Sequence, residues 1–210
     1  GDQHALDPER FGMEVPDDIH PIFHGLRIDA LDSLARVQPY PNGAKGYPAT
    51  GSGSSYTLKD GAVPAATGTV GLSVNVIDRY SNSSSTCGIR SLKVLVDEQP
   101  IHSAALAEVD FALQRFADAY MDYALFKSND MNYHRCYKLP NNQLAIYGKE
   151  AAQGRINLRP GDEKKVLVEA VDANGNRSEL RFTLRGAPTA QALSWSIPNV
   201  QGQYFGYDRE

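Results

Sequence analysis

The sequence predicts a mainly β protein, an antiparallel β-sandwich of immunoglobulin-like type that carries one helical insertion. Three observations favour this fold: short segments of alternating apolar and polar residues, turn signals between them, and one stretch of helical periodicity. A sandwich of this type needs about seven such strands. The 210 residues suffice for one buried core, with chain left over for arms and linkers.

The strand signals are clearest in residues 69–186, the expected sandwich domain. Residues 70–76 place valine or leucine at every second position, and residues 92–96 repeat the pattern after a turn-rich segment. Residues 165–184 form two alternating runs joined by Asp172–Asn176. This turn contains Asn174-Gly175, the pair that supplies the positive φ angles of tight antiparallel turns. We therefore expect a β-hairpin in the core of the domain.

The periodicity changes within residues 106–126, where we expect the helical insertion. Apolar residues recur there at steps of three and four, as on one face of an amphipathic helix: Leu106, Val109, Leu113, Phe116, Tyr120 and Tyr123. The first turns also fit a strand, because Val109–Leu113 alternates. Tyr120 and Tyr123 are expected in the core. Asp118 and Asp122 share the opposite, solvated face of the helix.

The remaining segments are expected to lie outside the sandwich. Residues 1–37 are interpreted as an N-terminal arm and a joining strand, and residues 187–210 as a C-terminal tail. Residues 38–68 are rich in proline, glycine and serine, which is typical of a linker.

Charge and hydropathy exclude two classes of partner. Lysine and arginine number 21 against 25 acidic residues, a net charge of −4, so the chain lacks the positive field that nucleic-acid binding requires. No apolar stretch is long enough to span a bilayer. No signal peptide opens the sequence, so an exported form has lost it.

Two cysteines, Cys87 and Cys136, leave two interpretations open. They form either one disulfide, which an exported protein would favour, or two separate small hydrophobic side chains. Closing a loop of about 50 residues would stabilise the fold by about 4 kcal/mol in the chain-entropy model.

The chemistry of the side chains indicates no catalytic residues, no metal ligands and no cofactor. Nucleophile, phosphate-binding and dinucleotide motifs are absent from the sequence. His20 and His24 have helical spacing, but they flank Pro21 in a strand-like segment. Asp172–Asn176 resembles the start of a calcium loop only faintly, because its sixth and twelfth positions are Arg177 and Thr183 instead of glycine and glutamate. Turn chemistry accounts for those residues.

Tyrosine is abundant, with eleven residues. Exposed tyrosines on a β-sandwich can stack on sugars or on partner proteins. Tyr40, Tyr47 and Tyr56 fall in the expected linker and are the candidate interaction surface.

Several short sequence segments, taken in their order along the chain, resemble the β-rich region that follows the catalytic domain in lysostaphin-type (LytM-like) zinc metallopeptidases of Bacteroidetes. They are Gly71–Asp78, Gly88–Asp97, Asp122-Tyr123, Leu139–Leu144, Tyr147 and Val168–Phe182, with Pro21–Leu31 similar to the joining strand. The family's zinc ligands, a His-x-x-x-Asp and a distant His-x-His, are missing, since His24 and Asp29 are one residue too far apart. A zinc peptidase needs three protein ligands.

The resemblance implies a non-catalytic accessory module of an exported, peptidoglycan-directed peptidase, located in the periplasm or outside the cell. Its expected partners are a catalytic peptidase domain in cis or in trans, and peptidoglycan or an envelope protein. The alternative is a cell-surface glycan- or protein-binding module. A third interpretation is an independent enzyme of a type that no motif identifies.

Overall fold

The protein is mainly β, as the sequence predicts. The computed structural model describes residues 4–6, 15–38, 40–41, 43–81, 83, 85–106, 108–129 and 131–188. Its strands are β1 (His4–Leu6), β2 (Ile22–Ala30), β3 (Arg36–Val37), β4 (Tyr40–Pro41), β5 (Ala44–Ser52), β6 (Ser55–Leu58), β7 (Ala65–Arg79), β8 (Thr86–Cys87), β9 (Ser91–Val96), β10 (Gln99–Ala105), β11 (Glu108–Asp110), β12 (Tyr133–Arg135), β13 (Ile156–Leu158), β14 (Glu163–Val171) and β15 (Arg177–Gly186). The helices are the 3-10 turns η2 (Lys59–Gly61) and η3 (Phe111–Phe116) and the α-helices α1 (Ala117–Tyr120) and α2 (Tyr123–Asn129). None of the helices described is long and apolar enough to cross a membrane.

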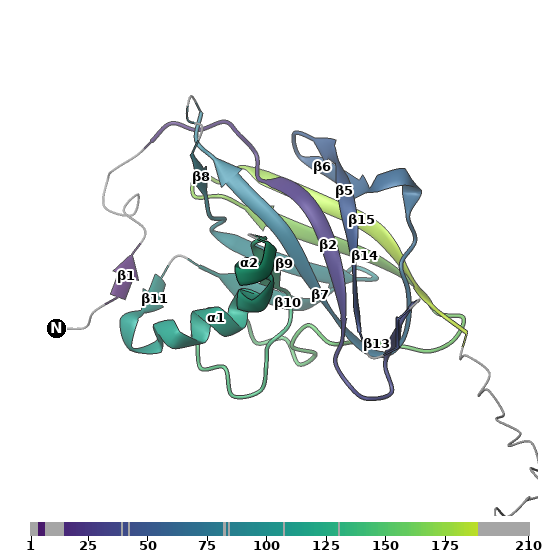
Figure 1. Cartoon of the computed structure of the whole chain (residues 1–210). Helices are drawn as coiled ribbons and strands as arrows, with labels where there is room; N and C mark the ends of the chain where they lie inside the picture. The colour runs from purple at the N-terminus through teal and green to yellow at the C-terminus, as the bar shows by residue number, and fades with distance from the viewer. Residues whose placement is uncertain are drawn as a thin grey trace, which may run out of the picture.

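Most of the strands belong to one continuous sheet, which curls like a barrel so that two parts of it, a front and a rear layer, face each other. Strands β2, β5 and β7 lie in front, and β9, β10, β14 and β15 lie behind them (Figure 1). Two long strands connect the layers. The first half of β5 pairs with β2 and its second half with β6, while the start of β7 pairs with β15 and its middle with β2. The hydrophobic core fills the space between the layers.

The alternation of residues 70–76 is confirmed as the buried face of β7. Val70, Leu72, Val74 and Val76 are at most 1% exposed, because they face the main hydrophobic core. The predicted hairpin is also confirmed: β14 pairs with β15 from Glu163 to Val171 without a register shift. Gly175 in its turn has a φ of 91°, the left-handed conformation for which glycine is suited.

The prediction that residues 38–68 form a linker is wrong. Strands β5 and β6 lie within this segment and pair with β2 and β15. Residues 55–58 of β6 alternate exposed and buried, which brings Tyr56 and Leu58 into the core. The N-terminal segment also joins the same body, because β2 pairs with β7 on one side and with β5 on the other. The proline and glycine residues of this segment thus belong to strands and to the β5–β6 hairpin, and not to a linker.

The helical insertion begins later than residue 106. Residues up to 105 belong to β10, residues 108–110 form β11 paired with β1, and the helical turns occupy residues 111–120 and 123–129. The alternative that the first turns are strand is confirmed for Val109 and Asp110, whereas residues 111–113 are helical. Tyr120 lies in a small second core with Leu144 and Ile146, as expected. Tyr123 is 46% exposed, so its expected core position is wrong. The helix breaks at Met121, where φ and ψ are −81° and 146°, and this break rotates Tyr123 outward.

The expected C-terminal tail, residues 187–210, lies outside the described residues except for its first two positions. Ala187 is buried, and its amide donates to the carbonyl of Ala66 on β7.

Candidate functional site

A buried carboxylate fixes the start of α2 to the sheet. Asp122 is 5% exposed, and its two oxygens each pair with one arginine. Oδ2 lies 3.2 Å from Nη1 of Arg27 on β2, and Oδ1 lies 3.2 Å from Nη2 of Arg135 on β12. Oδ1 also accepts a hydrogen bond from the amide of Leu125, which caps the helix. The expectation that Asp122 faces solvent is therefore wrong.

The two arginines extend this network into the sheet. Nε of Arg27 lies 2.7 Å from Oδ1 of Asp29, while the other oxygen of Asp29 accepts from the hydroxyls of Ser73 and Tyr137. Burial, and then the charge of Asp29, raises the pKa of Tyr137 well above its ordinary value, so this phenol stays a donor. The network holds the helical segment in a single position on the sheet.

Arg135 also closes the break between the two helices. Its Nη1 donates to the carbonyl of Ala119 at 3.0 Å and to that of Met121 at 3.2 Å. These carbonyls lie at the end of α1, where a helix leaves acceptors without partners. The arginine satisfies them and so stabilises the break that exposes Tyr123.

A groove of about 230 Å³ lies in front of this network. Its walls are formed by the end of α1, by α2 and by the start of β12: Asp118, Met121, Asp122, Tyr123, Phe126, Asn132 and Tyr133. Tyr123 and Phe126 are 46% and 40% exposed, and their ring centroids are 6.5 Å apart with planes tilted by 42°. Met131, which precedes Asn132 of the groove in the sequence, is 42% exposed. We call Tyr123, Phe126 and Met131 the aromatic patch.

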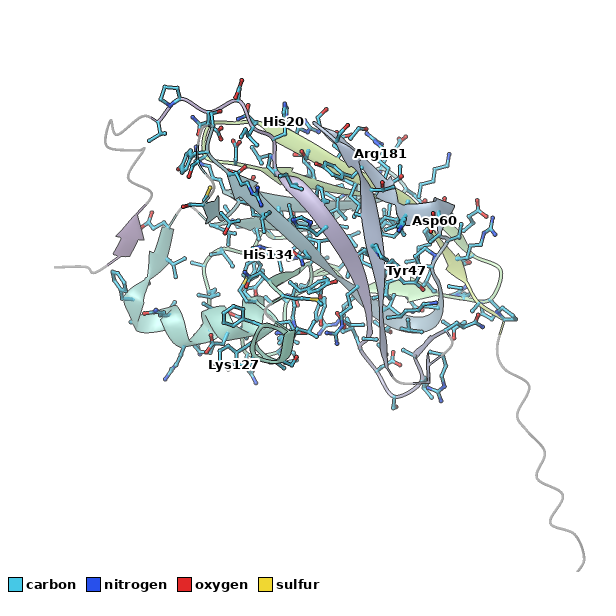
Figure 2. The ribbon with its side chains drawn as sticks, turned by 45° about the horizontal axis from the view of Figure 1, so that its top comes forward. His20, Tyr47, Asp60, Lys127, His134 and Arg181 are labelled. Carbon is cyan, nitrogen blue, oxygen red and sulfur yellow. The ribbon has the colours of Figure 1, made fainter. Side chains whose placement is uncertain are left out.

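One cation and one buried imidazole border the aromatic patch. Lys127 lies on the outer side of α2, with its Nζ 5.9 Å from the centre of the Tyr123 ring (Figure 2). His134 lies inward of the helices, with Nδ1 3.2 Å from the hydroxyl of Tyr120 (Figure 2). Burial lowers the pKa of His134 to about 4, so its ring is neutral at pH 7 and packs edge-on against Tyr120.

A second, larger hollow lies on the outer face of the rear layer. It measures about 400 Å³ and is lined by side chains of β9, β14 and β15 and the turn after β9. Leu95, Leu167 and Phe182 are half-buried there, next to Lys165 and Arg181. Arg181 pairs with Glu179 of its own strand, so this charge is already compensated.

The tyrosines expected to form an interaction surface do not form one. Tyr47 and Tyr56 are 8% and 6% exposed and belong to the main core, where Tyr56 packs edge-on against Phe23. The expectation for these two is wrong, because the segment that carries them is part of the sheet. The side chain of Tyr40 lies outside the described residues.

The two cysteines are unpaired, which settles the alternative left open above. Cys87 lies opposite Asp78 on β7, whereas the amide of Cys136 donates to the carbonyl of Leu72 on the same strand. Asp78 and Leu72 are six positions apart on β7, roughly 20 Å at 3.3 Å per residue. A disulfide requires Cα atoms within about 7 Å. The thiols therefore lend no support to export.

Among the described side chains, one group has the donors for a metal ion. Carboxylate oxygens of Asp17, Asp78 and Asp172 all lie within 4.8 Å of one another. The sequence predicts no metal ligands and indicates only a turn at Asp172. The three positions are 61 and 94 residues apart, so no local spacing could have indicated them.

The comparisons with known proteins give no relative. No protein-family model matches the chain, no curated protein matches it, and no solved structure matches its fold. The function must therefore be argued from the residues and from the surface that they build.

Proposed function

We propose that this chain is a non-catalytic accessory module of an exported, peptidoglycan-directed zinc peptidase, and that it binds the peptidase's catalytic domain through the aromatic patch. Its location would be the periplasm or the cell exterior. The family resemblance of the sequence supplies the class of partner. The aromatic patch supplies the surface, and it is the observation on which the proposal depends.

The composition of the patch favours a protein partner. Tyr123, Phe126 and Met131 are each at least 40% exposed, although they are large apolar side chains. Aromatic residues and methionine are enriched at the centre of protein interfaces, where a few of them contribute most of the binding free energy. The groove beside them could accept an apolar side chain of the partner.

The rigidity of the patch also favours binding. Asp122 caps the start of α2 and is paired with Arg27 and Arg135 of two strands. Side chains on a pre-organised base lose less conformational entropy when a partner covers them. The patch is thus an exposed apolar surface on a fixed support.

Glycan binding by the same surface is less favoured. A sugar stacks its flat face on a ring, and a flat strip of parallel rings extends that contact. The planes of Tyr123 and Phe126 are tilted by 42°, so the two rings offer no such strip.

The strand order supports an immunoglobulin-like assignment of the sandwich. The rear layer has the order β10-β9-β14-β15, in which two hairpins lie side by side with antiparallel neighbours. The C′-C-F-G strands of immunoglobulin variable domains have this arrangement. We propose that β9, β14 and β15 correspond to C, F and G.

The test measures binding of the purified chain to the zinc peptidase catalytic domain encoded upstream of it or beside it in the same genome, by calorimetry. We expect Tyr123→Ser and Phe126→Ser each to weaken binding roughly tenfold or more. Leu34→Ser is the matched control, because Leu34 is 78% exposed in the turn between β2 and β3, away from the groove.

Two results would overturn the proposal. One is wild-type affinity in the Tyr123→Ser/Phe126→Ser double variant. The other is binding to purified peptidoglycan sacculi that depends on the aromatic patch, with none to the catalytic domain, because that would favour the glycan-binding function.

A further inference from the structure

Three carboxylates meet at the end of the molecule opposite the β2–β3 turn. Asp17 lies in the segment that leads into β2, Asp78 lies next to the last residue of β7, and Asp172 begins the turn between β14 and β15. One oxygen of each lies within 4.8 Å of the other two. His20 marks this edge at the top of Figure 2, and its Nδ1 donates to the carbonyl of Arg177.

The carboxylate of Asp78 is buried and incompletely partnered. Asp78 is 3% exposed, and its Oδ1 has no hydrogen-bond partner. Its other oxygen accepts a weak hydrogen bond from the thiol of Cys87, at 3.7 Å. Oδ2 of Asp17 is likewise buried without a partner. These two carboxylate oxygens have lost their contact with water and gained no hydrogen bond in exchange. A bound cation would offset this cost of desolvation.

Neutral groups position the other oxygens of the cluster. The amide and the side-chain Nδ2 of Asn176 donate to the two oxygens of Asp172, both at 2.8 Å. The amide and hydroxyl of Ser81 donate to Oδ1 of Asp17 at 2.8 and 2.9 Å. These contacts orient the carboxylates without neutralising them.

No ion pair found among the described residues reaches any of the three carboxylates. The cluster therefore places up to three negative charges together, and no described positive group forms an ion pair with them. The electrostatic effect that repels a third carboxylate would attract a divalent cation.

We propose that Asp17, Asp78 and Asp172 bind a calcium ion. Calcium is favoured because the donors are all oxygens, and because calcium accepts six to eight of them in flexible geometry. Backbone carbonyls and water would complete the shell. Zinc would prefer a thiolate or an imidazole. The Sγ atom of Cys87 does not belong to the group of ligand atoms that lie within 4.8 Å of one another.

The site differs from the calcium loop that the hairpin turn faintly resembles. Asn174 and Asn176 contact this region through side-chain nitrogens, which cannot bind a cation. Nδ2 of Asn174 donates to the carbonyl of Val15, and that of Asn176 donates to Oδ2 of Asp172 and to the carbonyls of Asp17 and Ile19. The turn thus supplies one ligand and holds the segment that carries another. A bound ion would join this segment, β7 and the hairpin, independently of the partner proposed above.

The experiment uses the full chain after removal of metals with EDTA. Calorimetry with calcium chloride should give one site per chain. At 10 mM calcium the melting temperature should exceed that in EDTA by roughly 3–6 °C, if the dissociation constant is on the order of 1 mM or lower. Magnesium at the same concentration should give a smaller shift, because it demands octahedral geometry.

Asp78→Asn keeps the shape of the side chain and removes its charge. We expect it to weaken calcium binding roughly tenfold or more, and to melt in EDTA no lower than the wild type, because the apo repulsion is relieved. Asp17→Asn, at a half-buried position, repeats the test should Asp78→Asn fail to fold. Asp118→Asn, an exposed carboxylate on α1, is the matched control and should bind calcium like the wild type.

Three results would overturn the proposal: no calcium heat and no thermal shift in the wild type, an equal shift with magnesium, or wild-type calcium affinity in both Asp17→Asn and Asp78→Asn.

Discussion

Replacing Asp122 by alanine is expected to destabilise the fold strongly. The change removes two ion pairs, each 3.2 Å long, between a carboxylate with 7% side-chain exposure and two arginines with 24% and 16%. Breaking a fully buried pair costs about 3–5 kcal/mol. Arg27 keeps Asp29, and Arg135 keeps its two carbonyl acceptors, so neither charge is left without a partner.

The free energy of unfolding should therefore fall by less than it does when a buried charge is left without a partner. Two charge-assisted hydrogen bonds contribute about 1.5–3 kcal/mol each when the groups are buried. We discount this for the partial exposure of both arginines and add about 1 kcal/mol for the lost cap on α2. The free energy of unfolding should fall by about 2–4 kcal/mol.

The assay is urea unfolding at pH 7, followed by circular dichroism, with Asp118→Ala as the matched control. Asp118 is also an aspartate of the helical segment, but it is exposed, so its replacement should change the stability by less than about 0.5 kcal/mol. A loss below 1 kcal/mol for Asp122→Ala would refute the reasoning. So would a large dependence on salt, because a buried network is only weakly screened.

Two further predictions concern the buried side chains. Val168→Asp places a charge at a core position of β14 that is 0% exposed, so the free energy of unfolding should fall by several kcal/mol. The midpoint of urea unfolding should fall accordingly, and a midpoint near that of the wild type would contradict the packing. His102 and His134 have their pKa values lowered to about 4 by burial, so the unfolded chain binds more protons between pH 6.5 and 4. Stability should therefore fall as the pH falls through this window, by about 3 kcal/mol per histidine, and then level off. Urea unfolding at pH 7 and pH 4.5 measures this loss, which should be smaller in a His102→Gln/His134→Gln variant; an unchanged loss would contradict the assignment.

The elements that the sequence predicts correctly are those whose signal is local. The alternation in β7 and the Asn174-Gly175 turn of the hairpin each specify structure within a few residues. The β5–β6 hairpin was missed because its proline and glycine residues are typical of linkers. Residues 55–58 nevertheless alternate polar and apolar, and this signal could have identified β6.

The candidate site was less predictable, because its parts come from distant segments. Asp122 pairs with Arg27, 95 residues away, and no spacing rule connects them. A local signal did exist, since an aspartate before a helical turn is a favoured N-cap. A continuous helical pattern from Leu106 to Tyr123 concealed this signal. The helix breaks at Met121, where the side chain of the distant Arg135 donates to the carbonyls of Ala119 and Met121.

The pairing of β7 has a consequence for how the chain folds during synthesis. This strand pairs with β2 and β3 from upstream and with β8, β12, β13 and β15 from downstream. Its last partner, Gly186, leaves the ribosome about 120 residues after Ala66, with which it pairs. Such non-local pairing slows folding to the millisecond-to-second range.

Until then, β7 presents unpaired backbone groups along part of its length. Nascent chains in that state are the species that chaperones protect from aggregation. A truncation before β15 should therefore yield insoluble protein even though β2, β5 and β7 are complete, since the front layer has no rear layer to cover its core face.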